Sequence, residues 1–452
     1  MRALRIAFLT TLTLTLTTSA FAGTWYVAPP ASGGSDSNPG TLASPFATIT
    51  KGVSMLSAAG DVLNVRGGTY NESVTVWHKY GSSSDPIRIQ NYTNEHPVID
   101  GTGTTTNDVV VIDECSYVRF DGFEVKNGPK GGIGVWDADN VKVRWNDVHD
   151  CQNIGIGAGC TTVGTTHDIT FDGNDVKRCV LSNSARTATS GWQQAMSSFK
   201  CDHVTFVNNY VHESYGEGID FIVGDYATIA NNTLYDNYST NVYIDNGRHV
   251  TVDSNFIITG WGTNPSQYYR DGHPAGGISV ANEYYEVQKP STDLLITNNI
   301  TAWTNTGFGY GDWDYGGGLH YTTIANNTFY HANTDTILIN DDGTNETDTT
   351  VIENNIIDAY SDHYSAEAPS AGITWRTNDW YGGLSGHTFP GTGDITSDPQ
   401  LVNPSNGGGP TDYKLQSTSP CRNIGTTESL VTHDYWGTAR SSGSYDIGAH
   451  EY

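Results

Sequence analysis

Residues 204–209 read Val204-Thr-Phe-Val-Asn-Asn209, a run in which apolar side chains alternate before a closing asparagine. The same phrase ends at seven other asparagines: Asn146, Asn174, Asn232, Asn255, Asn299, Asn327 and Asn355. Successive asparagines lie 23 to 44 residues apart, and the segments alternate with a period of two and show no helical stripe. This repeat predicts an all-β, parallel solenoid in which each coil lies on the preceding one.

The recurrent asparagine has a structural explanation. Stacked coils are about 4.8 Å apart, so equivalent asparagines form a column whose side-chain amides satisfy backbone groups of the turns. The interval of 23 residues is the minimal coil, and longer intervals carry insertions around residues 182–193, 259–274 and 283–292. Because these insertions flank one row of strands, we expect them to form the walls of a cleft.

The ends of the chain depart from the repeat. Residues 1–22 have a basic start, an apolar stretch and a small-residue site at Ala20-Phe21-Ala22, which predicts a signal peptide cleaved after Ala22 and a secreted protein. Apolar residues at helical spacing predict a short capping helix at about residues 45–58. The period is lost after about residue 360, and we expect an irregular tail over 360–452 within a single β-helix domain, residues 23–452.

The charge of the chain limits its partners. The 452 residues include 49 acidic and 22 basic side chains, for a formal net charge of −27. This balance argues against nucleic acid, which is bound through Lys and Arg, and against anionic membrane surfaces. No later apolar run approaches the roughly 20 residues of a membrane span. We therefore expect a monomer that inserts into no membrane.

Stacking also predicts cross-links between coils. The chain has six cysteines: Cys115, Cys151, Cys160, Cys179, Cys201 and Cys421. Cys151 and Cys179 each follow their ladder asparagine by five residues, so they are predicted to stack and to form a disulfide. Cys160 and Cys201 form a second candidate pair, with an offset of one residue that a bulge would absorb. Free buried thiols are the alternative for both pairs, and the bonding of the remaining two cysteines stays open.

The chain resembles a known group of β-helix proteins. The resemblance is carried by Trp25-Tyr-Val-Ala-Pro, Ser44-Pro-Phe-Ala-Thr-Ile, Ala59-Gly-Asp-Val-Leu-Asn-Val-Arg-Gly-Gly-Thr-Tyr70 and Ser444-Tyr-Asp-Ile-Gly-Ala-His-Glu-Tyr452. These segments resemble the opening and close of the pectate-lyase-like superfamily, and family nine polysaccharide lyases are similar in style. The resemblance implies a single-stranded right-handed parallel β-helix that degrades a polysaccharide. It implies less about the reaction, because lyases, hydrolases, epimerases and adhesins share this framework.

The row of strands that follows the asparagine turns carries most of the candidate acids and bases. Overlaying the coils gives two outward columns: Ser197, Asp220, Tyr243 and Ser279 in one, and Phe199, Ile222, Asp245 and Ala281 in the next. The candidate catalytic residues around this face are Lys200, Asp220, Tyr243, Asp245, Arg270 and His273. Glu283 and the aromatic residues Tyr310, Trp313 and Tyr315 are candidates for substrate binding, because aromatic faces stack on sugar rings.

β-Elimination from a uronate glycan is the first reading of this surface. A base removes the proton α to the carboxylate while a cation neutralises that acid. Family nine lyases hold calcium with an Asp-Asp-Gly-x-Asp strand, and the matching stretch here is Gly216-Glu-Gly-Ile-Asp220, which makes Glu217 and Asp220 the candidate calcium ligands. The family's catalytic Lys has no counterpart in the following coils. The base would be Lys200, Tyr243 or His273, with Arg270 or calcium as the neutralising group.

Glycoside hydrolysis is the second reading. It needs two carboxylates about 5–10 Å apart, and Glu217, Asp220 and Asp245 on adjacent coils are expected to meet that distance. An acidic, aromatic-rich surface suits a neutral glycan better than a polyanion. A glycan-binding or adhesion protein without catalysis is the third reading, because this fold also serves that role.

Overall fold

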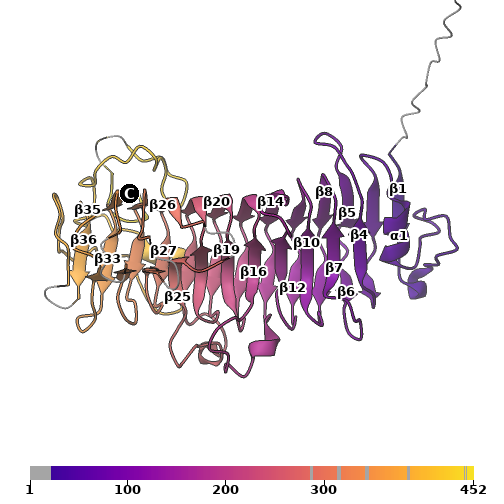
Figure 1. Ribbon diagram of the computed structural model, residues 1–452, viewed down its shortest axis with the longest axis horizontal. Helices are drawn as coiled ribbons and strands as arrows, with labels where there is room; N and C mark the ends of the chain where they lie inside the picture. Colours follow the sequence, from indigo (N-terminus) through magenta and orange to yellow (C-terminus); the bar gives the residue numbers. More distant parts are fainter. Residues whose placement is uncertain are drawn as a thin grey trace, which may run out of the picture.

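The computed structural model describes residues 22–452 except 286–288, 313–316, 342–345, 384–386, 442 and 444. Within this part the chain winds into an elongated column of coils, with α1 (Ile49–Met55) at one end and the last strands at the other (Figure 1). Residues 1–21 of the predicted signal peptide, and the predicted sugar-stacking residues Trp313 and Tyr315, lie outside the described residues.

Three parallel sheets run the length of the column, and each complete coil contributes one strand to each. Sheet I has 13 strands: β1 (Thr24–Val27), β2 (Val62–Val65), β5 (Ile87–Asn91), β8 (Val118–Asp121), β11 (Lys142–Arg144), β14 (His167–Asp172), β17 (Asp202–Val207), β20 (Asp225–Ala230), β23 (Arg248–Asp253), β26 (Thr292–Thr297), β29 (Thr323–Ala325), β32 (Thr350–Glu353) and β35 (Ile373–Arg376).

Sheet II has 12 strands: β3 (Gly68–Tyr70), β6 (Pro97–Asp100), β9 (Glu124–Lys126), β12 (Asp147–His149), β15 (Asp175–Lys177), β18 (Tyr210–His212), β21 (Thr233–Tyr235), β24 (Phe256–Ile258), β27 (Ile300–Ala302), β30 (Thr328–Tyr330), β33 (Ile356–Ala359) and β36 (Asp379–Gly382).

Sheet III has 11 strands: β4 (Val74–Trp77), β7 (Asp108–Asp113), β10 (Gly131–Trp136), β13 (Ile156–Gly159), β16 (Gln194–Phe199), β19 (Glu217–Ile222), β22 (Thr240–Asp245), β25 (Gly276–Asn282), β28 (Phe308–Asp312), β31 (Ile337–Asn340) and β34 (Ala366–Glu367). Short 3₁₀ turns lie at Pro30–Ser32, Leu181–Asn183, Pro265–Gln267 and Pro410–Tyr413. This arrangement is the predicted right-handed parallel β-helix.

The asparagine column is confirmed as the element that sets the stacking. The side-chain oxygen of Asn174 accepts hydrogen bonds from the backbone N–H of Asn146 at 3.1 Å and from its side-chain amide at 3.0 Å. The same pattern joins Asn209 to Asn232 and continues to Asn355 and Asn378. These asparagines are almost fully buried, so the ladder satisfies backbone groups that water cannot reach.

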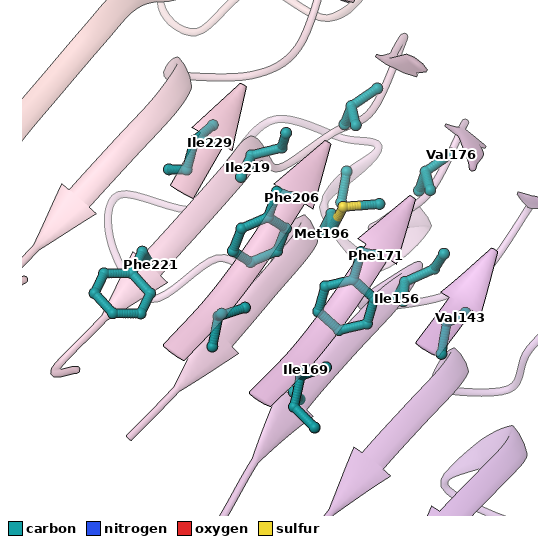
Figure 2. Packing of buried hydrophobic residues seen from close by; sticks show 14 of the residues in the cluster. Val143, Ile156, Ile169, Phe171, Val176, Met196, Phe206, Ile219, Phe221 and Ile229 are labelled. Carbon is teal, nitrogen blue, oxygen red and sulfur yellow. The ribbon is translucent and has the colours of Figure 1, made fainter. Parts of the chain in front are cut away.

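The core between the sheets is apolar and continuous. Figure 2 shows side chains of sheet I facing those of sheet III. The rings of Phe171 and Phe206 stack with centroids 5.2 Å apart, while Met196 and Ile219 are fully buried on the opposing strands. Every coil thus buries its apolar face only between its neighbours, as a solenoid requires.

The capping helix is shorter than the sequence predicted, and the coils continue further toward the C-terminus. The helix α1 spans only Ile49–Met55, where Thr48 caps it by accepting from the backbone N–H of Lys51 at 3.1 Å. The coils continue past residue 360 to Gly382, because β35 and β36 add a further turn. The rest of the tail packs on sheet II, where Tyr413 and Ile447 join a buried cluster with Phe256. No helix of the described residues is long and apolar enough to cross a membrane.

The structure contains no disulfide, so the predicted pairing is corrected. All six cysteines lie among the described residues and are buried, unbonded thiols. The predicted partners are nevertheless neighbours, because the side chains of Cys151 and Cys179 interact, as do those of Cys160 and Cys201. Equivalent side chains of an in-register parallel ladder point the same way about 4.8 Å apart, whereas disulfides need Cβ atoms about 3.5–4.5 Å apart.

The ladder gives a test of the stacking. In Asn232→Ala, the backbone N–H and side-chain amide of Asn209 lose their acceptor in a buried position. We expect the free energy of unfolding in urea to fall by about 2–4 kcal/mol, because buried donors without partners are costly. Thr228→Ala, on the exposed face of the same strand β20, should change it by less than about 0.5 kcal/mol. Equal effects of the two substitutions would contradict a structural ladder.

Candidate functional site

The strand β19 presents two carboxylates on one face although they are three residues apart. Register pairs Glu217 with Gln194 and Asp220 with Ser197, but no pair is formed at Gly218. A Cβ at Gly218 would lie 2.9 Å from the core side chain of Leu234 and 2.2 Å from a backbone oxygen. Gly218 and Ile219 therefore both face inward, and the strict alternation is broken. This break turns Glu217 outward beside Asp220.

The two predicted outward columns are present. Asp220 lies against Tyr243 in the ladder, and Tyr243 against Ser279. Ile222 lies against Asp245. The coils thus place chain-distant polar groups next to one another on the outer face of sheet III, as the repeat predicted.

A pocket of about 470 Å³ opens on this face. Its walls include Trp192 of the insertion at 182–193 and Arg270 of the insertion at 259–274. Two loops project from the same side of the column beneath β16 and β25 in Figure 1. The pocket floor includes Glu217, Tyr243 and Glu283, so two carboxylates and a phenol face one cavity.

Glu217 is the most perturbed carboxyl that lines this pocket. Burial raises the pKa of Glu217 to about 7, against opposing hydrogen bonds from Trp192 and Asp220. Asp220 lies behind it, 1% exposed, where burial and the charge of Glu217 raise the pKa of Asp220 well above its usual range. Asp220 therefore retains a proton and donates it in a hydrogen bond to Glu217. The pair holds one exchangeable proton at the pocket surface.

The second carboxylate, Glu283, is positioned by three contacts. The hydroxyl of Tyr243 donates to Glu283 Oε1 at 2.6 Å. Asn246 accepts from the backbone N–H of Glu283 at 2.7 Å and donates to its carbonyl oxygen at 3.0 Å. Glu283 follows directly after β25 and lines the same pocket as Glu217, although the sequence predicted only that it binds substrate.

Asp245 is buried in the outward column next to that of Tyr243. Its side chain is 2% exposed, and Tyr285 donates a short hydrogen bond to it. Burial and the charge of Glu283 raise the pKa of Asp245 to about 8. Neither Asp245 nor Asp220 lines the pocket. Asp220 acts on Glu217 through a hydrogen bond, and Asp245 acts on Glu283 and Glu217 through charge.

The predicted cations and bases are only partly brought together. Arg270 lines the pocket with its guanidinium 4.6 Å from the centre of the Trp192 ring. Lys200 follows the end of β16 and lies over the Phe199 ring instead of among the pocket residues. His273 faces a different cavity, on the far side of the insertion that carries Arg270. The structure thus brings Arg270, but not Lys200 or His273, into this pocket.

Tyr310 is the one predicted sugar-stacking residue that lies among the described residues. Tyr310 lies opposite Val280 in the ladder and is 2% exposed in the core, where its hydroxyl accepts from Asn282 at 3.0 Å. It is nevertheless among the residues that line the pocket, so its role in substrate binding stays a prediction. Trp192, which the sequence analysis did not single out, is a second aromatic residue of the pocket wall. Its only signal was a tryptophan within an insertion that flanks the strand row.

The carboxylates do not fit the calcium site that the resemblance implies. Calcium takes six to eight oxygen ligands, and Gly216 offers no side chain where the family has its first Asp. Glu217 and Asp220 instead hydrogen-bond to each other. The described residues contain no group of three or more His, Cys, Asp or Glu side chains placed to hold a metal.

Comparisons with known proteins agree on the fold. Residues 25–310 match the family described as "Pel9A-like, right handed beta helix region". The structure of pectate lyase Pel9A superposes with a TM-score of 0.56 at 17% identity, over 96% of this chain and 97% of that one. The complex of XylC with xylose gives 0.55 at 11% identity, over 94% and 98%.

One curated protein is similar over a short segment. The uncharacterized protein YwoF of Bacillus subtilis (strain 168) is 43% identical over 76 residues, which are 17% of this chain and 15% of that protein. The match thus spans a small part of either chain.

The buried acids predict that stability falls as the pH rises. The folded-state pKa of Asp245, about 8, and of Glu217, about 7, exceed the unfolded values near 4. Their stabilising contribution is complete below pH 4 and is lost as the pH rises through 7 to 8, because the folded state binds more protons. We expect a lower melting temperature at pH 9 than at pH 5, with a smaller difference in Asp245→Asn.

The matched control is Asp293→Asn, which changes an exposed carboxylate of β26. Its pH dependence should equal that of the unmodified protein. A melting temperature that rises from pH 5 to pH 9 would show that these acids are ionised in the folded state.

Proposed function

Because this chain belongs to the Pel9A-like right-handed β-helix family, we propose that it degrades a polysaccharide, and that it does so as a glycoside hydrolase acting on a neutral glycan. The observation that carries the proposal is the placement of Glu217 and Glu283 in one pocket beside an aromatic wall. Two carboxylates facing one sugar site are the requirement of glycoside hydrolysis.

Glu217 acts as the general acid in this proposal. A carboxyl with a pKa near neutrality is protonated at working pH and still able to give its proton to the glycosidic oxygen. When Glu217 loses that proton, the hydrogen bond from Asp220 stabilises the carboxylate that remains. Burial thus gives the acid its proton, and Asp220 accommodates the charge that the transfer creates.

Glu283 is the anionic partner, as nucleophile or as the base that activates water. Its hydrogen bond from Tyr243 and its backbone contacts with Asn246 fix its direction. Cleavage breaks the bond between the anomeric carbon and the glycosidic oxygen; the leaving group takes the proton of Glu217, and water supplies the new hydroxyl. Trp192 and Arg270 lie where they stack on the sugar and donate to its hydroxyls.

The pocket is less suited to β-elimination than to hydrolysis, because the candidate bases are absent from it or remain protonated. Of the three bases that this reaction would require, Lys200 and His273 do not line the pocket. Tyr243 does, but burial and the charge of Asp245 raise its pKa far above neutrality. A phenol held in that state is a poor base. The net charge of −27 also disfavours a polyanionic substrate.

The similar structures support a carbohydrate as the substrate class, because one is named as a pectate lyase and another as a complex with xylose. Their low identity leaves the reaction to be argued from the residues. We place the activity outside the cell, in a monomer, on the strength of the predicted signal peptide and the acidic surface.

The reaction products distinguish a hydrolase from a lyase and from a binding protein. On a panel of neutral glycans, pectin and alginate, we expect reducing ends from a neutral glycan without the ultraviolet absorbance of an unsaturated sugar. Glu217→Gln should lower kcat by about 10²–10⁴, the usual contribution of a general acid, while Lys200→Gln should retain activity. Unsaturated products would establish a lyase, and no cleavage of any glycan would favour a binding protein.

The pH profile tests the role of Glu217. Because the acid works only while protonated, kcat/KM should fall above about pH 7, the pKa that burial gives Glu217. The measurement is kcat/KM from pH 4 to pH 9 on the neutral glycan that is cleaved. A rate that instead increases through pH 7 to 9 would assign Glu217 to the deprotonated role.

A further inference from the structure

A second pocket of about 450 Å³ lies beside the first. The insertion at residues 259–274 contributes to both, since Arg270 lines the first pocket while Tyr269 and His273 line the second. The remaining walls come from turns of later coils and from Asn406 of the C-terminal tail. Segments far apart in the chain therefore converge on this cavity.

The wall formed by the coils is aromatic. Trp303, His331 and Tyr360 occupy the turns after β27, β30 and β33, on three successive coils. The ring centroids of Trp303 and His331 are 5.1 Å apart, and those of His331 and Tyr360 are 4.2 Å apart. Trp303 Nε1 donates to the hydroxyl of Tyr413 at 3.1 Å. These rings are held in place by the protein, so little ordering is required when a ligand binds.

The polar groups of this pocket are neutral amides and hydroxyls together with the imidazoles of His273 and His331. Asn333 and Asn406 are exposed and line it together with His273. Among the described residues that line the pocket, none is Lys, Arg, Asp or Glu. Amides both donate and accept, as sugar hydroxyls do, and aromatic rings suit the apolar faces of pyranose rings. The described lining thus offers no Lys or Arg to a uronate carboxylate.

The two pockets meet across neighbouring coils. Asn305 lines the first pocket and Asn333 lines the second, and Asn333 donates to the side chain of Asn305 at 3.5 Å. The backbone N–H of Asn333 also donates to the carbonyl of Thr304 at 2.8 Å. Adjacent coils are about 4.8 Å apart, close to the length of one sugar unit. A glycan seated in the first pocket can thus continue into the second.

We propose that this second pocket binds a neutral pyranose unit of the same glycan chain whose scissile bond lies in the first pocket. The identity of the chain rests on the proposed function; the pocket's preference for a neutral sugar rests on its own lining. The second pocket is then a remote subsite, which selects chains long enough to fill both cavities.

The test is retardation of the Glu217→Gln protein in native gels that contain arabinoxylan, galactan, mixed-linkage β-glucan or polygalacturonate. At least one neutral polysaccharide should retard it. Adding Tyr360→Ala together with Asn333→Ala should raise the apparent dissociation constant about three- to tenfold, the size of a lost stacking contact. Tyr226→Ala, at an exposed tyrosine of sheet I outside the pocket, is the matched control and should leave it unchanged.

A second variant guards against misfolding. His273→Ala changes an exposed loop residue, so it should weaken retardation while the melting temperature stays that of the parent. Equal retardation of all variants, retardation by polygalacturonate alone, or none at all would overturn the subsite.

Catalytic activity is measured separately, with variants that retain Glu217. The pocket substitutions should lower kcat/KM for long chains and leave disaccharide derivatives unaffected. Retardation that depends on Tyr360 without any cleavage would contradict the proposed hydrolase while leaving the subsite standing. Cleavage of the glycan together with retardation that Tyr360→Ala leaves unchanged would contradict the subsite while leaving the proposed hydrolase standing.

Discussion

The side-chain amide of each ladder asparagine is shared between two coils, and this contact holds the coils in register. Asn232 donates to the oxygen of Asn255 at 2.9 Å and to the backbone carbonyl of Phe206 at 2.9 Å. A slip of one residue would reverse the inward and outward faces of a strand and would break these buried bonds together. The register in turn decides which chain-distant side chains become neighbours on sheet III.

The candidate site exploits one local departure from that register. At Gly218 two successive residues face the core, which a side chain at this position would prevent. Glu217 and Asp220 are thereby brought to the same face, and burial gives both carboxyls raised pKa values. The cost of burying acids is tolerated in folded proteins chiefly where it serves a function. The insertions then close the pocket around Glu217 and supply Trp192 and Arg270.

The alternation of apolar residues in the sequence was sufficient to predict the fold and to predict which residues lie next to one another in the middle of adjacent strands. It placed Asp220 beside Tyr243 and Ile222 beside Asp245, and both pairs are present. The same overlay carried one coil further would have set Tyr310 beneath Val280, in the core. The repeat did not predict the coil that ends at Asn378, because its strand, Ile373-Thr-Trp-Arg-Thr-Asn378, is flanked by Gly- and Ser-rich segments.

The loops were beyond such reasoning. Periodicity says nothing about where an insertion points, and so Arg270 and His273, three residues apart, could not be assigned to different pockets. The role of Glu283 was equally hidden, because it lies past the end of β25 and is aimed by Tyr243 and Asn246. Contacts of this kind depend on tertiary packing, which a single sequence does not report.

The most direct measurement is a crystal structure of the Glu217→Gln protein with a bound neutral oligosaccharide. We expect a glycosidic oxygen within hydrogen-bond distance of the side chain at position 217 and an anomeric carbon facing Glu283. A sugar bound elsewhere on the column, or one whose glycosidic bond lies away from both side chains, would contradict it.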